Sequence, residues 1–261
     1  SRTIARPSFK EKSIAQIFDP VTSTTFIGNI DILPTKILNY DLRWELFQED
    51  AQMYAISLFY KDFTNPIELV VYNGASPNDY TPKNVDEAKV YGIELEFRKN
   101  LEFISESLSN FKLTFNTSII RSEEIMDEKE YEGRTKSARS GEVVSRKREL
   151  QGQSPYLINL GLNYNSINNN FEGSLNYNVQ AKTLQIVGVN YVPDIYTEPF
   201  NSLNLNFNYK FGRTDNLKLG LGIKNLLDEK IESYYYTNDI KSIYSSLSPR
   251  REFKLSLGIN F

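Results

Sequence analysis

The sequence contains no cysteine and no histidine, and it has only one tryptophan and two methionines among its 261 residues. The absence of cysteine excludes disulfides, thiolate metal sites and cysteine nucleophiles. The absence of histidine excludes Ser-His-Asp and Cys-His catalysis, as well as zinc or haem held by histidine. We therefore expect no catalytic residue, no cofactor and no metal site.

Long apolar runs are missing as well. No stretch reaches the roughly 18 apolar residues of a membrane-spanning helix, and the mean hydropathy is −0.45. These values do not exclude spanning strands, because only every second residue of such a strand faces lipid. The net charge of −3 and the pI near 5.3 offer no basic surface for nucleic acid, so no nucleic-acid partner is expected.

Aromatic side chains are plentiful, with 17 tyrosines and 16 phenylalanines. Many lie in segments of about ten residues in which apolar and polar side chains alternate, the period of an extended strand. In residues 36–48, for example, Leu42 and Trp44 share one face, while Arg43 and Glu45 share the other. The pattern predicts about ten strands, at residues 1–7, 36–48, 53–63, 89–99, 111–120, 155–165, 171–181, 203–211, 217–223 and 253–261.

The connections between these segments alternate between short and long. Residues 166–170 and 212–216 form tight turns, whereas residues 121–151 and 225–249 form long, polar connections. A soluble β-domain also alternates within its strands, but it has no reason to place every long loop at one end. The rhythm therefore favours an all-β, antiparallel transmembrane barrel with short periplasmic turns and long external loops.

The last predicted strand ends on an aromatic residue, and Leu257, Ile259 and Phe261 share its apolar face. It runs toward the short turns, which predicts a periplasmic C-terminus. Residues 1–7 resemble the end of a strand already under way, and neither an initiator methionine nor a signal peptide precedes them. We expect the chain to be a fragment of a longer protein.

Two groups of side chains are candidates for contacts with an external ligand or with lipopolysaccharide. Tyr234, Tyr235, Tyr236 and Tyr244 fall in a predicted external loop, where they either stack on a ligand or pack the loop and anchor it at the interface. The long connection 121–151 carries a basic cluster that either attracts an anion or forms a solvated, mobile loop. Its members are Arg134, Lys136, Arg139, Arg146, Lys147 and Arg148.

The polar faces of the predicted strands carry charges suited to a wet interior. Arg43, Glu45, Glu94, Glu96 and Arg98 are candidates either for contacts with a domain inside the barrel or for simple solvation. In the segment Asn-Leu-Leu-Asp, Asp228 is expected to shape the turn above its strand.

Several motifs resemble those of TonB-dependent outer-membrane receptors. Residues 88–99 (AKVYGIELEFRK) are similar to a mid-barrel strand of that family, residues 222–228 (GIKNLLD) to its penultimate strand, and residues 249–261 to its closing strand. Residues 6–9 (RPSF) and 150–159 (LQGQSPYLIN) resemble the receptor-like barrels common in Bacteroidetes.

The resemblance implies that residues 1–261 are the C-terminal portion of a 22-stranded barrel in a Gram-negative outer membrane. It further implies a plug domain of the same polypeptide, energy from the inner-membrane TonB complex, and uptake of a scarce small nutrient such as an iron chelate, a glycan or a peptide. It also implies that Leu257, Ile259 and Phe261 resemble the signal read by the barrel-assembly machinery. The sequence departs from the family by omission, because the plug, the TonB box and the earlier strands are not in it.

A second interpretation is a self-contained outer-membrane barrel of about ten strands with a binding or structural function. A small barrel hydrolase fits poorly, since the protease and phospholipase versions depend on histidine, which is absent.

Overall fold

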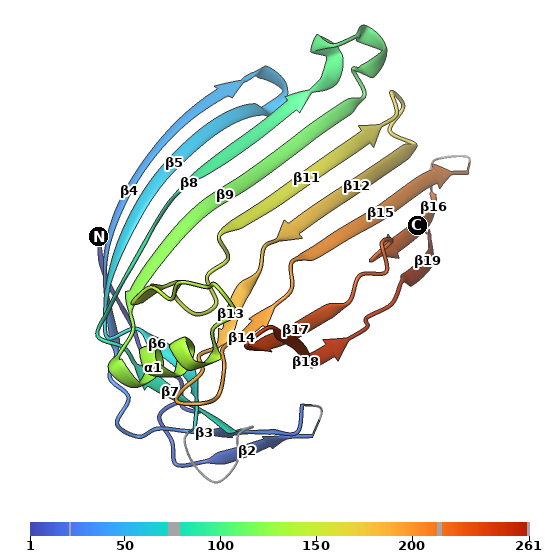
Figure 1. Ribbon diagram of the computed structural model, residues 1–261. Coiled ribbons are helices and arrows are strands. Elements are labelled where there is room, and N and C mark those ends of the chain that lie inside the picture. Colours follow the sequence, from blue (N-terminus) through green and yellow to red (C-terminus); the bar gives the residue numbers. More distant parts are fainter. Residues whose placement is uncertain (21, 73–78, 213–215, 260–261) are drawn as a thin grey trace.

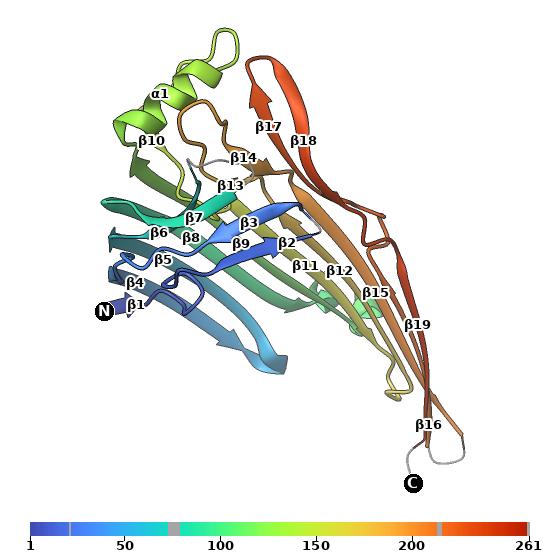
Figure 2. The same ribbon diagram turned by 90° about the horizontal axis from the view of Figure 1, so that it is seen from below.

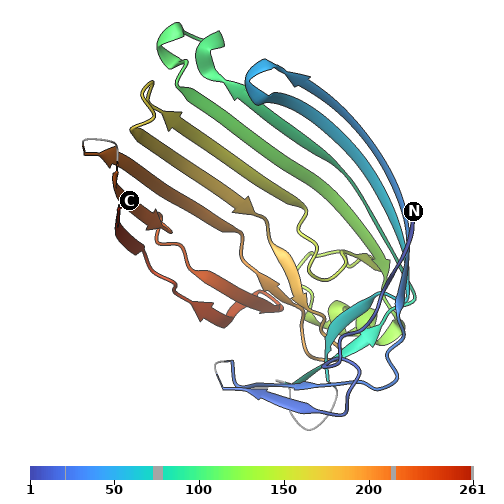
Figure 3. The same ribbon diagram turned by 180° about the vertical axis from the view of Figure 1, so that it is seen from behind.

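The computed structural model describes residues 1–20, 22–72, 79–212 and 216–259. Its main sheet is open, curved and antiparallel, and it consists of ten successive strands and the short strand β10 (Lys147–Arg148), which pairs with β9. The order of the ten strands in the sheet follows the chain, from blue to red in Figures 1 and 3. They are β1 (Arg2–Ala5), β4 (Thr35–Gln48), β5 (Gln52–Thr64), β8 (Glu87–Asn100), β9 (Phe111–Ile125), β11 (Tyr156–Asn165), β12 (Phe171–Gln180), β15 (Phe200–Phe211), β16 (Leu217–Lys224) and β19 (Glu252–Ile259). The predicted strands are confirmed, and β1 and β19 are the two edges of the sheet.

One face of this sheet is apolar and exposed. Leu42, Trp44, Leu58, Leu219 and Leu255 lie on it, and the side chain of Leu255 is 74% accessible. A water-soluble monomer rarely exposes an apolar surface of this extent, whereas a sheet that faces lipid requires it.

The opposite face is polar and changes in character across the sheet. On β4, β5 and β8 it carries charged residues, whereas from β9 to β16 its middle carries amides and glycines. Asn159 donates to Asn116 at 3.3 Å and accepts from Asn178 at 2.6 Å, which forms a row of amides across β9, β11 and β12. Strict alternation places these groups on one side because neighbouring strands keep the same register.

The short turns lie at one end of the sheet and all long connections at the other, as Figure 1 shows. The long connections are not simple loops as the sequence predicted, since they contain two further four-stranded sheets within the described residues. One comprises β2 (Gln16–Asp19), β3 (Thr24–Ile27), β7 (Asp79–Asn84) and β6 (Ile67–Val71), and the other β13 (Thr183–Ile186), β14 (Ile195–Thr197), β17 (Ile231–Thr237) and β18 (Ile240–Leu247). Six of these strands have only three to six residues, and the longer β17 and β18 do not alternate between apolar and polar residues, which is why periodicity did not reveal them.

Apolar contacts join these two small sheets. Val70, Leu184 and Val187 form one buried cluster, and Val71, Ile186 and Ile195 form a second. Each cluster takes residues from both sheets, so segments more than 100 residues apart in the chain share a core.

Between β9 and β11 the chain forms helix α1 (Glu128–Ser137) and the short strand β10 (Lys147–Arg148), which pairs with the end of β9. The Asp127 side chain caps α1 by accepting a hydrogen bond from the Glu130 N–H at 2.9 Å. Figure 2 shows α1 and the β17–β18 hairpin at the same end of the molecule, with β13 and β14 between them.

No helix within the described ranges is both long enough and apolar enough to span a membrane. Strand β9 extends five residues beyond its predicted end, and this extension carries Arg121 and Glu123 on the same face as Ile119. Charged groups on the apolar side of the strand place this end of β9 outside any hydrocarbon layer.

Candidate functional site

A pocket of about 340 Å³ opens at the loop end, between α1, the segment that follows it, β14 and β17. We call it the loop-end pocket. Its lining combines four cationic and three acidic side chains with three tyrosines. They are Arg134, Arg139, Lys147 and Lys182, then Glu142, Glu149 and Asp194, then Tyr196, Tyr234 and Tyr236.

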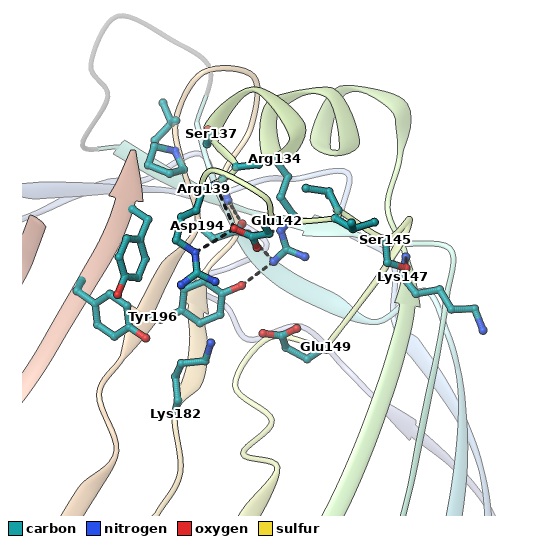
Figure 4. Close-up of a pocket in the computed structure, with 18 residues that line it drawn as sticks. Arg134, Ser137, Arg139, Glu142, Ser145, Lys147, Glu149, Lys182, Asp194 and Tyr196 are labelled. Carbon is teal, nitrogen blue, oxygen red and sulfur yellow. Dashed lines mark hydrogen bonds and ion pairs between the residues drawn. The ribbon is translucent and has the colours of Figure 1, made fainter. Parts of the chain in front are cut away.

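Helix α1 places Arg134 at the wall of this pocket. Its guanidinium lies 2.5 Å from Oδ2 of Asp194 and donates to the Tyr196 hydroxyl at 2.7 Å (Figure 4). Burial opposes the charge of Arg134, but Asp194 outweighs it and raises the pKa of the guanidinium. Burial, and then Asp194, raise the pKa of Tyr196, so its hydroxyl stays protonated. The wall thus holds a fixed cation and a neutral phenol.

Arg139 and the tyrosines of β17 form another side of the pocket. Arg139 binds Glu142 at 3.1 Å and lies 5.0 Å from the centre of the Tyr236 ring. Tyr234 meets Tyr236 edge-to-face, with ring centres 5.6 Å apart. Burial, and then Glu198, raise the pKa of Tyr234 to about 12. Rings held in this way offer flat aromatic surface beside a cation.

Lys182 supplies a cation that is not neutralised by a carboxylate among the described residues. Its ammonium lies 4.3 Å from the centre of the Tyr196 ring, and Figure 4 shows it pointing toward that ring. The Lys147 ammonium points out of the pocket instead and binds Glu123 at 2.9 Å. The pocket can therefore bind a polar ligand with anionic or aromatic groups.

The four predicted tyrosines divide between two environments. Tyr234 and Tyr236 line the loop-end pocket, whereas Tyr235 and Tyr244 pack against the apolar cluster of Val71, Ile186 and Ile195. The tyrosines lie in strands β17 and β18, so their side chains point to opposite sides of a small sheet. The structure does not bring all four together.

The basic residues of 121–151 also divide between two environments, so the alternative of a loop solvated throughout was wrong. The Arg148 side chain is fully buried and that of Arg134 is 19% accessible, whereas at least half of each side chain is accessible in Lys136, Arg139, Arg146 and Lys147. Arg148 can be buried because three acidic side chains from other elements surround it, and Arg134 is partly buried against Asp194, features that no local pattern reports.

Arg148 is the centre of what we call the Arg148 cluster. Its guanidinium binds Glu68 of β6 at 2.6 Å, Glu124 of β9 at 2.9 Å, and Glu130 of α1. Burial, and then the charge of Glu68, raise the pKa of Glu124 to about 9, and burial raises the pKa of Glu130. Breaking a buried ion pair of this kind is costly, so the cluster ties α1 to two strands.

Four of the five predicted charges on the polar face form one network. Arg43 binds Glu45 at 2.5 Å and Glu96 at 3.1 Å, and Arg98 lies 3.6 Å from Glu96. Arg43 also donates to Ser57 at 2.8 Å. Glu94 lies nearby and lines a cavity of about 450 Å³ together with Arg43.

The C-terminal candidates are placed only in part. Leu257 and Ile259 lie exposed on the apolar face of β19, while Phe261 falls outside the described residues. In the Asn-Leu-Leu-Asp segment, Asn225 shapes the turn more than Asp228 does. Asn225 is buried, accepts from the Glu229 N–H at 3.0 Å, and donates to the Glu229 and Arg250 carbonyls.

No group of three or more acidic side chains in the described ranges is arranged to hold a metal ion. Sequence reasoning missed Asp194, Tyr196, Lys182 and Glu142, which line the pocket beside the predicted tyrosines. Nothing in their local sequence marks them, because tertiary contacts between separate long connections create the pocket.

A family model described as TonB dependent receptor-like, beta-barrel, matches residues 1–226. No curated protein matches the sequence.

Solved structures with the same fold include one receptor and two transporters, each less than 20% identical to this chain in sequence. A mutant of the ferric enterobactin receptor PfeA from Pseudomonas aeruginosa, in complex with enterobactin, has a TM-score of 0.59 and 16% identity, with 100% of this chain and 37% of that chain covered. The ferric citrate transporter FecA, unliganded, has a TM-score of 0.59 and 17% identity over 86% and 31% of the two chains. The copper transporter OprC has a TM-score of 0.61 and 19% identity over 100% and 35%. This chain therefore spans about a third of the length of these proteins.

Proposed function

Because this chain belongs to the TonB-dependent receptor-like β-barrel family, we propose that it forms part of a receptor that takes up a scarce nutrient across the outer membrane. The apolar face of the sheet would contact outer-membrane lipids. The polar face would line the lumen, where Arg43, Glu45, Glu94, Glu96 and Arg98 would meet a plug domain of the same polypeptide. Uptake would draw its energy from the inner-membrane TonB complex.

The loop-end pocket carries this proposal, as the site where an external ligand is first bound. It lies at the end of the long connections, and its fixed cations and tyrosine rings suit a small ligand with anionic and aromatic or hydroxyl groups. Tyr234 and Tyr236 would contact the ligand, while Tyr235 and Tyr244 would support the sheet behind it.

The orientation follows from the same assignment. If the long connections are external, β19 runs toward the periplasm, and Leu257, Ile259 and Phe261 would present the barrel-assembly signal there. Exposed cations at the loop end, such as Arg146 and Lys147, would then lie near lipopolysaccharide phosphates. Residues 6–9 and 150–159 favour a Gram-negative receptor of the Bacteroidetes type.

The alternative is a self-contained barrel of about ten strands with a binding or structural function. The sheet does not close on itself, because β1 and β19 stand at opposite ends of the strand order. Open edges in lipid leave backbone groups unpaired. This observation favours a larger barrel over the small one.

Calorimetric titration of the full-length receptor tests the proposal. Ferric catecholates, ferric citrate, copper, malto-oligosaccharides and short peptides would be titrated in turn. We expect one class to bind, with affinity reduced at least tenfold by Arg134→Gln or Tyr236→Ala and unchanged by the control Lys136→Gln, which lies outside the pocket. A deletion strain that grows like its parent on every one of these nutrients would favour the static barrel.

A further inference from the structure

One short segment runs from the loop-end pocket to a second cavity on the polar face. We call residues 147–153 the strap. Lys147 and Glu149 line the loop-end pocket, whereas Leu150 and Gln153 line the cavity of about 450 Å³ that also contacts Arg43 and Glu94. This seven-residue segment therefore reaches from one cavity to the other.

The middle of the strap is held by buried ionic contacts. Arg148 has no accessible side-chain surface, and it binds Glu68, Glu124 and Glu130 from three different elements. Its Nη1 also donates to the Glu149 carbonyl at 2.9 Å. The strap cannot shift at this point without moving a charge that has no access to water.

Gln151 attaches the second half of the strap to β6. The Gln151 side chain accepts from the Leu69 N–H at 2.6 Å and donates to the Leu69 carbonyl at 2.9 Å. The Gln151 N–H donates to Glu68 Oε1 at 2.8 Å, and Glu68 also binds Arg148. A displacement of Glu68 is therefore shared by Arg148 and Gln151.

Helix α1 connects this system to the pocket wall. Glu130 belongs to the Arg148 cluster, and Arg134, one turn later, holds Asp194 and Tyr196 in the pocket. Gly133 between them packs so closely on residue 190 that a Cβ would lie 2.2 Å from the Asn190 carbonyl oxygen. With so little space, α1 moves as a unit rather than by local rearrangement.

The Arg148 cluster is also incompletely satisfied. Three carboxyl groups face one guanidinium, and Glu124 Oε2 is buried with no hydrogen-bond partner in the described part of the chain. A buried polar atom without a partner is costly, so this oxygen raises the free energy of the present arrangement.

We propose that the strap transmits occupancy of the loop-end pocket to the lumen, with Arg148 as the positioning residue at its centre. The proposal rests on the proposed function, because it takes the pocket to be the ligand site. An anionic ligand that draws Arg134 away from Asp194 displaces α1 and Glu130. The Arg148 cluster then rearranges, and Leu150 and Gln153 shift against the lumenal charges.

Spin labelling of the full-length receptor in membranes tests this step without the natural ligand. A nitroxide at Gln153→Cys reports on the lumenal end of the strap, and the Gln153 side chain donates its one described hydrogen bond to the adjacent Ser154 carbonyl. Arg134→Gln mimics the release of Asp194. We expect it to raise the mobile fraction of the label at least twofold, while Lys136→Gln on the same helix leaves the spectrum unchanged.

The double variant identifies the route. If the signal passes through Glu130, Arg134→Gln has no further effect on the label in a Glu130→Gln background. An unchanged label at residue 153 in Arg134→Gln, together with an altered label at Ser145→Cys beside the pocket, would overturn the proposal. So would an effect of Arg134→Gln that persists in full when Glu130 is replaced.

Each labelled variant is first checked for the heat-modifiable band of an assembled barrel, and Glu124→Gln serves as the cluster variant if Glu130→Gln does not assemble.

Ligand titration separates the two proposals. Binding that depends on Arg134 with no response at residue 153 refutes the strap alone, whereas a response at residue 153 without binding of any ligand refutes the pocket as ligand site.

Discussion

Glu130 and Arg134 lie one turn apart on α1, yet Glu130 belongs to the buried Arg148 cluster and Arg134 to the wall of the loop-end pocket. Arg134 also contacts Met126 before the helix, with its Nη1 3.8 Å from the sulfur. The helix is short and mostly polar, so its position depends on these tertiary contacts rather than on its own propensity. Replacing either Glu130 or Arg134 should therefore change the contacts of the other.

The stability of α1 and the Arg148 cluster should depend on pH through the protonation of Glu124. Its pKa is raised to about 9 in the folded protein, so the folded state holds a proton that the unfolded state releases above its ordinary pKa. The stabilising contribution is complete at low pH and is lost as the pH rises toward about 9. We expect the protection of α1 amides, corrected for intrinsic exchange, to fall between pH 5.5 and 8.5.

Glu124→Gln should flatten that slope by at most about 1.4 kcal/mol per pH unit, the value for one proton. Glu132→Gln, on an exposed pair with Lys136, is the matched control and should leave the slope as it is. Protection that rises with pH would contradict the assignment of a protonated Glu124.

Gly92 should tolerate no side chain. It lies opposite Phe59, and a Cβ at this position would come within 2.3 Å of the Ile119 carbonyl oxygen and 2.8 Å of the Phe59 ring. Gly92→Ala should lower the free energy of unfolding by about 1–3 kcal/mol through overpacking. The measurement is urea unfolding of the refolded receptor in lipid vesicles. Gly258→Ala, whose Cβ would meet no atom closer than 3.8 Å, should be nearly neutral.

Consecutive residues of β15 should respond in opposite ways to a charge. Leu205 lies on the apolar face and Asn206 on the polar face beside Gly222. Leu205→Arg should cost up to about 2–4 kcal/mol if it lies near the bilayer midplane, whereas Asn206→Arg should cost much less. Unfolding in vesicles measures both, and equal costs would mean that the two faces are not lipid and lumen.

Asn225 should stabilise the connection between β16 and β17 through its side chain and its backbone. It has a φ of 51°, and it makes three hydrogen bonds to the backbone of Glu229 and Arg250. Asn225→Ala should lower stability by about 1–3 kcal/mol, because it leaves buried backbone groups unpaired. Asn225→Asp keeps the acceptor for the Glu229 N–H but loses the two donors, so its stability should lie between that of the wild type and that of Asn225→Ala. Thermal unfolding of the β17–β18 hairpin, monitored by its susceptibility to proteolysis, would show this order.

The barrel wall was determined by the sequence alone. Alternation with a period of two is a local property, and it sets which residues of β4, β15 or β19 share the apolar face regardless of what the rest of the chain does. The same alternation predicted that Arg43, Glu45, Glu96 and Arg98 share a face, and their ion pairs follow from the register of β4, β5 and β8.

The structure of the long connections and of the loop-end pocket depends on tertiary contacts and could not be predicted from the sequence. The strands in these connections are either very short or, like β17 and β18, do not alternate. The pocket and the ion pairs join connections far apart in the chain, such as Glu68 with Arg148 or Arg134 with Asp194. A run of arginines and lysines looks the same in sequence whether its members are solvated or buried. Arg148 is buried because three acidic side chains surround it, and these side chains come together only when the chain folds.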